Sequence, residues 1–438
     1  MARALLAGEQ SSNAIGARLA VTLGQTWRWV SPLAARYHKI FAGQTRPRLR
    51  AVIRFLEDDE LFQRACKRHA AKLRLAQWAT EPQQMQPVSA ARAWPLPAIE
   101  TVAALAGWLG LTVGEVEWFA DRKRLNRNAA TGPNATSKLH HYNYRVLRKP
   151  HGAVRLIEIP KPRLKRLQQQ VLREILGRIP NHEAVHGFRK GRSITTFAGP
   201  HVGQAVVQRM DLHDFFPSFS AARVQGLFRT AGYPEPVADL LAGICLNAAP
   251  RGLWREKGLG PERLNEARML YARPHLPQGA PTSPALANCL SYRVDCRLTG
   301  LAQAAGATYT RYADDLAFSG GEEFARRAEH FSIHVAAILQ EEGLEVHHRK
   351  TRVMRQGVRQ YLAGTVVNER LNVPRADYDR LKATLTNCLR LGPKSQNWDG
   401  HPAFRSHLEG RISFVRMVNP EKAMRLRELF DRIDWTPP

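Results

Sequence analysis

The sequence predicts a mixed α+β protein, in which helical segments at both ends flank a middle part that contains β-strands. Apolar runs of strand type occur at 205–212, which carries the acidic Asp211 near its end, and at 309–318, which surrounds an acidic pair. Two strand-like runs with turn residues between them predict a β-hairpin over 144–159. The first 80 residues and the tail from about 375 have the spacing of amphipathic helices.

The remaining elements follow from local signals. A helix pair is expected over 96–119, broken at Gly110, because apolar residues recur at helical spacing and Thr112 with Glu115 forms a capping box. Proline and small residues predict a linker at 81–97. Further expected elements are a basic helix at 64–74, a helix at 164–179, a strand at 361–367 and a tail helix with Phe404, Leu408, Ile412 and Val415 on one face.

The charge balance indicates an anionic partner. The 438 residues contain 65 Lys and Arg against 38 Asp and Glu, a formal net charge of +27 that is spread along the chain. Nucleic acid is the commonest partner for such a surplus, because unneutralised positive charge repels itself in a compact fold. The alternative is a merely basic soluble protein.

The five cysteines are scattered and include no CxxC pair, which argues against a disulfide framework and a zinc site and fits a reducing cytoplasm. The N-terminus lacks the apolar core of a signal peptide, and no run of about 18 apolar residues occurs, so no membrane span is expected. We therefore expect a cytoplasmic location.

Acidic residues beside the predicted strands are the candidate catalytic groups. Asp211 ends one apolar run, and Asp314 with Asp315 interrupts another. Carboxylates in buried surroundings must be paired or bound to cations. Because neighbouring side chains on a strand point to opposite faces, two adjacent acids can share a site only at a bend or hairpin turn. Such carboxylates could hold two Mg²⁺ ions for phosphoryl transfer, although an Asp-Asp pair alone is more often a simple turn.

Three longer motifs resemble the boxes of reverse transcriptases. YADD at 312–315 resembles the YxDD box, with the alanine typical of bacterial members, and DLHDFFPS at 211–218 resembles the first palm motif. Between them, LPQGAPTSP at 276–284 resembles the LPQGxxxSP box in its retron-type form. HGFRKGRS at 186–193 and GLEVHHRKT at 343–351 are similar to two further family motifs. The chain thus resembles bacterial retron-type reverse transcriptases, which are RNA-directed DNA polymerases, over roughly residues 96–438.

The sequence departs from the retron pattern at two signatures. NAAPR at 247–251 has Arg251 where the NAxxH signature has histidine, and LAG at 362–364 keeps only the glycine of VTG. The first 90 residues lie outside the resemblance, and their role is open. These departures leave other bacterial reverse transcriptases as alternatives, namely group II intron, diversity-generating or CRISPR-associated enzymes. A non-catalytic RNA-binding scaffold is the alternative from another class.

The resemblance implies the right-hand polymerase fold, with fingers, an antiparallel-sheet palm and a helical thumb, preceded by a helical N-terminal extension. The expected domains are the extension at 1–90, fingers at 91–200, a palm with interleaved finger elements at 201–368, and a thumb at 369–438.

Individual roles also follow from the resemblance. Asp211 and Asp314 are expected to be the principal ligands of two Mg²⁺ ions, for which Mn²⁺ could substitute, with Asp315 supporting them. Phe216 occupies the position of an aromatic steric gate that selects dNTPs; the alternative is an ordinary core phenylalanine. The other expected nucleotide-binding residues are Lys149, Arg155, Gln278, Gly279 and Lys350; for Lys350 a salt-bridge role is the alternative.

A retron enzyme would copy part of a structured non-coding RNA into DNA. It would prime from a guanosine 2′-hydroxyl of that RNA and make a branched RNA–DNA molecule, msDNA, in phage defence. The implied partners are the structured RNA, the RNA/DNA hybrid and dNTPs, with an effector protein and a separate RNase H as further candidates, since no nuclease motif is visible.

Overall fold

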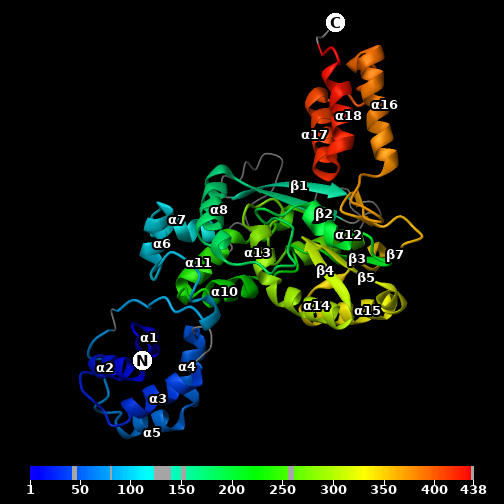
Figure 1. Ribbon diagram of the computed structural model, residues 1–438. Helices are drawn as coiled ribbons and strands as arrows, with labels where there is room; N and C mark the ends of the chain where they lie inside the picture. Colours follow the sequence, from blue (N-terminus) through cyan, green and yellow to red (C-terminus); the bar gives the residue numbers. More distant parts are fainter. Residues whose placement is uncertain (42–46, 79–80, 123–139, 149–153, 255–260, 436–438) are drawn as a thin grey trace. The chain divides into compact units, whose positions relative to one another are not determined.

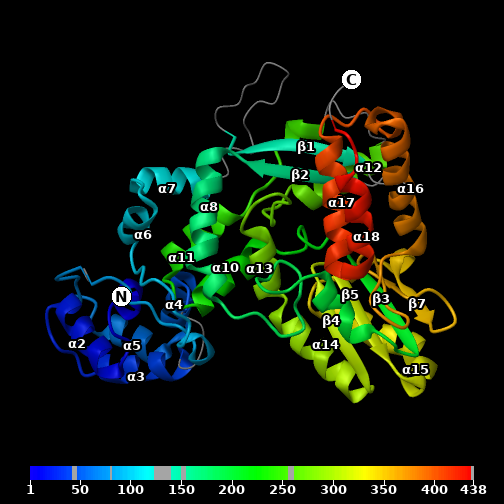
Figure 2. The same ribbon diagram turned by 45° about the horizontal axis from the view of Figure 1, so that its top comes forward.

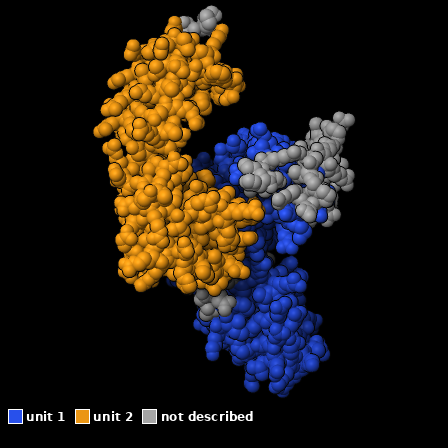
Figure 3. Space-filling model, turned by 90° about the vertical axis from the view of Figure 1, so that its right-hand side faces the viewer, with its two compact units in different colours: residues 1–180, 216–290 blue, residues 181–215, 291–438 orange. Residues whose placement is uncertain are grey.

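The structure is a computed structural model that describes residues 1–41, 47–78, 81–122, 140–148, 154–254 and 261–435. It divides into two compact units (Figure 3). The first contains residues 1–180 and 216–290, and the second contains residues 181–215 and 291–438. Lys149 lies outside the described residues. Among the described helices, none has both the length and the apolar character needed to cross a bilayer.

The N-terminal extension is helical, as predicted (Figure 1). It has its own apolar core. Leu5, Leu19, Leu33 and Val52 are fully buried together in that core. The basic helix is shorter than expected, because it ends at Arg68 and the chain then turns through residues 69–72. The helices are α1 (Ala2–Leu6), α2 (Ser12–Leu23), α3 (Val30–Phe41), α4 (Leu49–Asp58) and α5 (Glu60–Arg68).

The segment predicted as a linker is held by backbone hydrogen bonds. The Gly8 amide donates to the Pro82 carbonyl at 2.9 Å, and the Gln86 amide donates to the Gly232 carbonyl at 2.9 Å. Gly232 has φ +101, and a side chain there would collide with Pro87. These contacts join the N-terminal helices to the turn between α10 (Ala221–Thr230) and α11 (Glu235–Cys245) of the same unit.

The helix pair is present, but its first helix begins later than predicted. Thr101 caps α6 (Val102–Leu109), and the residues from 96 to 100 stay extended because Pro95 and Pro97 disfavour helix. The capping box formed by Thr112 and Glu115 at the start of α7 (Val113–Ala120) is confirmed.

The predicted β-hairpin consists of β1 (Tyr142–Arg148) and β2 (Val154–Pro160), with Val146 opposite Leu156. The helix after it, α8 (Pro162–Glu174), is shorter than predicted, because a 3₁₀ turn at Leu176–Arg178 replaces its last residues. The rest of the first unit is helical and contains α10 (Ala221–Thr230), α11 (Glu235–Cys245), α12 (Pro261–Tyr271) and α13 (Ser283–Leu290), with short 3₁₀ turns at Ser89–Ala91 and Arg251–Trp254.

The second unit is built on an antiparallel sheet with β3 (Val206–His213) at its centre. One edge of β3 pairs with β5 (Asp315–Gly320), which pairs in turn with β4 (Ala307–Tyr312). The other edge pairs first with β7 (Arg352–Arg355) and then with β6 (Glu345–Val346). The long helices α14 (Tyr292–Ala304) and α15 (Glu322–Glu341) pack along the sheet (Figures 1 and 2).

The rest of the second unit precedes or follows this sheet. A short helix α9 (Ile194–Ala198) and 3₁₀ turns at Gly199–His201 and His348–Lys350 adjoin its strands. Helices α16 (Arg375–Leu391), α17 (Phe404–Val418) and α18 (Pro420–Asp431), with a 3₁₀ turn at Pro393–Gln396, form a helical tail with its own core. Leu408, Ile412 and Val415 are buried in that core, as predicted, and Phe404 packs at its edge.

The predicted strand at 361–367 is instead a tight hairpin. Its strands are β8 (Tyr361–Leu362) and β9 (Thr365–Val366), and the turn between them has φ +42 at Ala363 and φ +88 at Gly364. The apolar run predicted one strand because its composition does not show that the chain reverses at Gly364.

A fully buried ion pair links α14 to β4. Arg311 Nε lies 2.8 Å from Asp295 Oδ1, Nη2 lies 2.7 Å from Oδ2, and both side chains are 0% exposed. Tyr309 donates from its hydroxyl to the same carboxylate at 2.9 Å. Because both charges are buried, each depends on the other for compensation.

We expect Asp295→Ala to lower the free energy of unfolding by about 3–5 kcal/mol, because it leaves the Arg311 guanidinium buried without a counter-charge. Urea unfolding followed by circular dichroism measures this. Glu60→Ala is the control, since the side chains of Glu60 and Arg64 are 80% and 74% exposed, and its effect should stay within about 0.5 kcal/mol. Equal effects of the two substitutions would contradict the role of the buried pair.

Candidate active site

The central strand and the β4–β5 hairpin bring the three predicted aspartates together. Asp211 in β3 lies opposite Asp315, the first residue of β5. The Leu212 amide donates to the Asp314 carbonyl at 3.0 Å, so the hairpin turn is fastened to the strand that carries Asp211. Asp314 and Asp315 therefore lie at a hairpin turn, which is the place where two adjacent acids can face the same site.

The turn before the acid pair is strained and tightly packed. Ala313 has φ +57, a left-handed conformation that is unfavourable for a residue with a side chain. Arg311 Nη1 donates to the Ala313 carbonyl at 3.1 Å. On the other side, a Cβ on Gly187 would lie only 2.6 Å from the Ala313 amide nitrogen, so only glycine fits there. Local backbone strain of this kind is common at functional sites.

Basic side chains hold two of the three carboxylates. Lys350 Nζ lies 2.8 Å from Asp211 Oδ2. Arg209 donates to Asp315 Oδ1 from Nε at 2.9 Å and from Nη2 at 2.7 Å. Lys350 reaches Asp211 because β6 pairs with the end of β3 and the His347 amide donates to the Asp211 carbonyl at 2.7 Å. Within the described residues, Asp314 forms no ion pair.

The cluster carries excess negative charge. Burial raises the pKa of Asp314 above its usual value, and the nearby charges of Asp211 and Asp315 raise it further. Burial also raises the pKa of Asp315, although Arg209 opposes that shift. A cation placed among these carboxylates would remove the repulsion that both shifts reflect.

The donor chemistry fits a hard divalent cation, because carboxylate oxygens are the ligands that Mg²⁺ prefers. Among the described residues, however, no three His, Cys, Asp or Glu side chains are already gathered as a complete metal-binding group. Two of the carboxylates instead bind Lys350 and Arg209. Each ion pair uses one oxygen of its carboxylate, Oδ2 of Asp211 and Oδ1 of Asp315, so the other oxygen of each could still ligate a metal.

The predicted nucleotide-binding residues other than Lys350 and the undescribed Lys149 belong to the first unit. Arg155 is exposed on β2, Phe216 and Gln278 are half-buried, and Gly279 is exposed. The Glu158 amide donates to the Gln278 carbonyl at 2.9 Å, which brings the strand of Arg155 and the loop of Gln278 together. The three aspartates and Lys350 lie together in the second unit.

The sequence reasoning missed several residues that shape these sites. Left-handed backbone occurs at Phe188, Asp214, Ala313 and Ala363, each within a motif or signature position of the sequence. Neither the left-handed backbone nor the ion pairs of Arg209 and Arg311 can be predicted from residue spacing or composition. The nearest clue was position in the sequence, because Arg209 shares a strand with Asp211 and Arg311 closely precedes the Asp314–Asp315 pair.

Comparison with known proteins identifies the family. Residues 147–366 match the family model described as reverse transcriptase (RNA-dependent DNA polymerase). The chain is 40% identical to the Retron Mx65 reverse transcriptase of Myxococcus xanthus over 335 residues, which cover 76% of this chain and 71% of that protein. It is 38% identical to the Retron Mx162 reverse transcriptase of the same organism over 346 residues, covering 76% and 67%.

A third relative, the Retron Ec86 reverse transcriptase of Escherichia coli, is 30% identical over 293 residues, covering 66% of this chain and 80% of the relative. Within the family, the hairpin that carries the YADD box and the strand that carries Asp211 are the palm of a right-hand polymerase. The chain therefore belongs to the retron-type reverse transcriptases and is an RNA-directed DNA polymerase.

Proposed function

We propose that the chain copies part of a structured non-coding RNA into DNA, with Asp211 and Asp314 as the principal metal ligands. The observation that carries this proposal is the joining of β3 to the β4–β5 hairpin, which gathers Asp211, Asp314 and Asp315. Asp315 is the supporting residue in this scheme, because Arg209 already holds its carboxylate through two hydrogen bonds. Asp314 is more available for a cation, since it has no ion pair within the described residues.

Reverse transcriptases generally use divalent metal ions. We propose Mg²⁺ as the physiological ion, with Mn²⁺ as a substitute. A bound pair of such ions supplies activation of the primer hydroxyl and charge stabilisation of the leaving pyrophosphate. Asp211 and Asp314 would hold the ions, and an ion bound at Oδ2 of Asp211 would release Lys350 from that oxygen. The freed ammonium group could neutralise or protonate the pyrophosphate, which is the alternative to its salt-bridge role.

Residues of the first unit are proposed to bind the incoming nucleotide. Arg155, exposed on β2, offers a guanidinium fork to the triphosphate. Lys149, which lies outside the described residues, is proposed as a second phosphate-binding residue. Gln278 can hydrogen-bond the sugar or the template. The half-buried Phe216 is proposed to block a 2′-hydroxyl with its ring.

The retron relatives support a finer proposal about the product. Priming from a 2′-hydroxyl of the bound RNA would give a branched RNA–DNA molecule, and its biological role would be phage defence. An effector protein and a separate RNase H are the proposed protein partners.

Asp314→Asn should reduce dNTP incorporation by at least about 100-fold, because it removes a carboxylate that the metal-dependent reaction requires. The measurement is Mg²⁺-dependent primer extension on an RNA template. The thermal midpoint should stay equal or rise, since the substitution removes a negative charge that burial and neighbouring carboxylates disfavour. Glu323→Gln, on the exposed surface of α15, is the control and should extend normally. Normal extension by Asp314→Asn would refute the assignment.

Phe216→Ala should raise the incorporation of rNTPs relative to dNTPs by at least about tenfold, because a smaller side chain leaves room for the 2′-hydroxyl. Competing single-nucleotide extensions measure this ratio. Phe215→Ala is not a suitable control, since Phe215 is buried at 4% exposure and its loss should destabilise the unit. Phe216→Tyr, which keeps the ring, should preserve selectivity. Unchanged selectivity in Phe216→Ala would leave Phe216 as an ordinary packing residue.

The nucleic acid that copurifies with the chain tests the retron proposal. We expect an RNA–DNA species that resists exonuclease at a 2′–5′ branch and becomes linear after debranching. Sequencing before and after debranching identifies the RNA and the priming nucleotide. Purification without bound RNA, from cells that contain the native gene neighbourhood, would count against it.

A further inference from the structure

A fully buried carboxylate lies on the inner face of the β1–β2 hairpin. Glu158 is 0% exposed. Its Oε1 accepts a hydrogen bond from Asn247 Nδ2 at 2.8 Å, and its Oε2 lies 2.8 Å from His275 Nε2. Asn247 Nδ2 also donates to the Tyr144 hydroxyl at 3.0 Å. We refer to Asn247, Glu158 and His275 as the hairpin triad.

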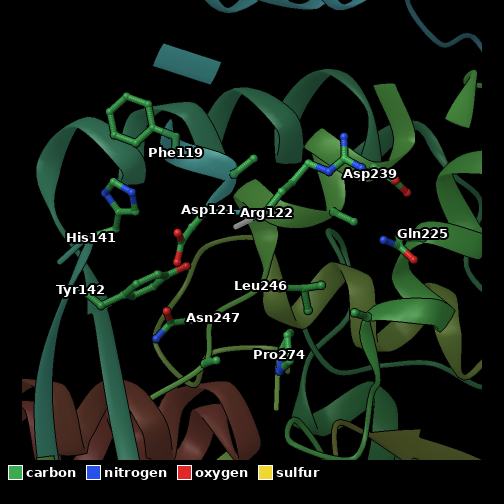
Figure 4. A pocket seen from close by; sticks show the side chains of 15 residues that line it. Phe119, Asp121, Arg122, His141, Tyr142, Gln225, Asp239, Leu246, Asn247 and Pro274 are labelled. Atoms are coloured by element: carbon green, nitrogen blue, oxygen red, sulfur yellow. Dashed lines mark hydrogen bonds and ion pairs between the residues drawn. The ribbon is translucent and has the colours of Figure 1, made fainter. Parts of the chain in front are cut away.

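The backbone delivers the two partners of Glu158 together. Asn247 and His275 form an antiparallel bridge, in which the Asn247 amide donates to the His275 carbonyl at 3.1 Å and the His275 amide donates back at 2.9 Å. Asn247 also lines a cavity of about 260 Å³. Tyr142 lines the same cavity, and both side chains are labelled in Figure 4. Asn247, the first residue of the NAAPR segment, therefore has Glu158 as its structural partner.

The hydrogen-bond partners of His275 determine its protonation. Its Nδ1 lies 2.7 Å from the Arg273 carbonyl oxygen, and its Nε2 faces the Glu158 carboxylate. Both partners are acceptors, so both ring nitrogens carry hydrogen and the imidazole is charged when Glu158 is ionised. Burial alone lowers the pKa of His275, but the charge and hydrogen bond of Glu158 outweigh burial and raise it. The triad thus contains a buried ion pair whose hydrogen bonds are satisfied.

Glu158 also touches the loop that carries the QG box. Its amide donates to the Gln278 carbonyl at 2.9 Å. Gly279 has φ +129, and a Cβ there would lie 2.8 Å from the Glu158 carbonyl oxygen, so the loop is pressed against β2. The opposite face of β2 carries the exposed Arg155. Glu158 therefore joins the strand of Arg155 to the loop of Gln278.

The geometry points to the hairpin triad as a positioning device that fixes the QG loop against β2 and so sets the placement of Gln278 relative to Arg155. This inference rests on the proposed function, in which those two residues bind the incoming nucleotide. Glu158 and His275 act through the loop and the strand, without touching nucleotide. Loosening the triad should therefore weaken nucleotide binding more than it slows the chemical step.

Steady-state incorporation of dTTP on poly(rA)/oligo(dT) by the full chain tests the inference. Glu158→Leu removes both side-chain hydrogen bonds, and we expect KM for dTTP to rise at least about tenfold while kcat changes by less than about threefold. Glu158→Gln should keep KM within about threefold of the unsubstituted chain. Its amide oxygen can still accept from Asn247, and its NH₂ group can donate to a neutral His275.

A double substitution separates positioning from stability. Glu158→Leu leaves His275 without its partner, whereas Glu158→Leu combined with His275→Leu replaces the buried charge pair with apolar side chains, which commonly restores stability. We expect the double variant to recover the thermal midpoint lost in the single variant and to keep the raised KM. If the single variant does not fold, the double variant alone carries the test.

Gln168→Leu is the matched control from the same unit. Gln168 is 0% exposed and donates from Nε2 to the Tyr142 hydroxyl at 2.8 Å and to the Ile244 carbonyl at 2.9 Å, so its loss removes buried hydrogen bonds that involve neither the QG loop nor a member of the triad. It should lower the thermal midpoint and leave KM unchanged. A raised KM in this control, or a normal KM in the double variant, would overturn the positioning role. Absence of incorporation by the unsubstituted chain would instead contradict the proposed function.

Discussion

The buried contact between Arg311 and Asp295 fixes the turn on which the aspartate cluster depends. The guanidinium satisfies the Asp295 carboxylate with two nitrogens and has a third free to bind the Ala313 carbonyl. It thereby holds a left-handed alanine immediately before Asp314. A turn held only by its own backbone could relax to a less strained conformation and carry the carboxylate away from Asp211. The buried Arg311–Asp295 pair thus helps to set the position of the turn that carries Asp314.

The same logic of compensated charge extends to the carboxylates themselves. Lys350 and Arg209 offset part of the negative charge, while Asp314 retains a raised pKa because burial and two acidic neighbours disfavour its ionised form. The cluster is therefore held in a state of electrostatic repulsion that cations can relieve. The carboxylate of Glu158 in the first unit differs, because each of its two oxygens has a hydrogen-bond partner, Asn247 for Oε1 and His275 for Oε2. The half-buried Asp314 suits ligand binding, whereas the fully buried Glu158 suits a fixed architecture.

The sequence was sufficient to predict the class of fold, the hairpin, the helical ends and the proximity of the three aspartates, because periodicity and long motifs report these directly. It misplaced the start of α6, the end of α8 and the reversal at Gly364, where proline, a 3₁₀ turn and positive φ override apolar spacing. It could not predict the partners of the charged groups. Asp295 with Arg311, and Glu158 with His275, meet only through tertiary packing, and a lone acid or histidine in a sequence does not reveal which residue will neutralise it.

The position of β3 in the sheet has a consequence for how the protein is made. This strand pairs with β5 on one edge and with β6 and β7 on the other, so Val206 meets Arg355 in the finished sheet. A ribosome must therefore synthesise the chain through Arg355 before the strand that bears Asp211 has both neighbours. Until then an apolar strand edge is open to pairing with other chains. Slow or interrupted translation within residues 214–355 would prolong that exposure, and chaperones that cover unpaired edges would be most useful during this interval.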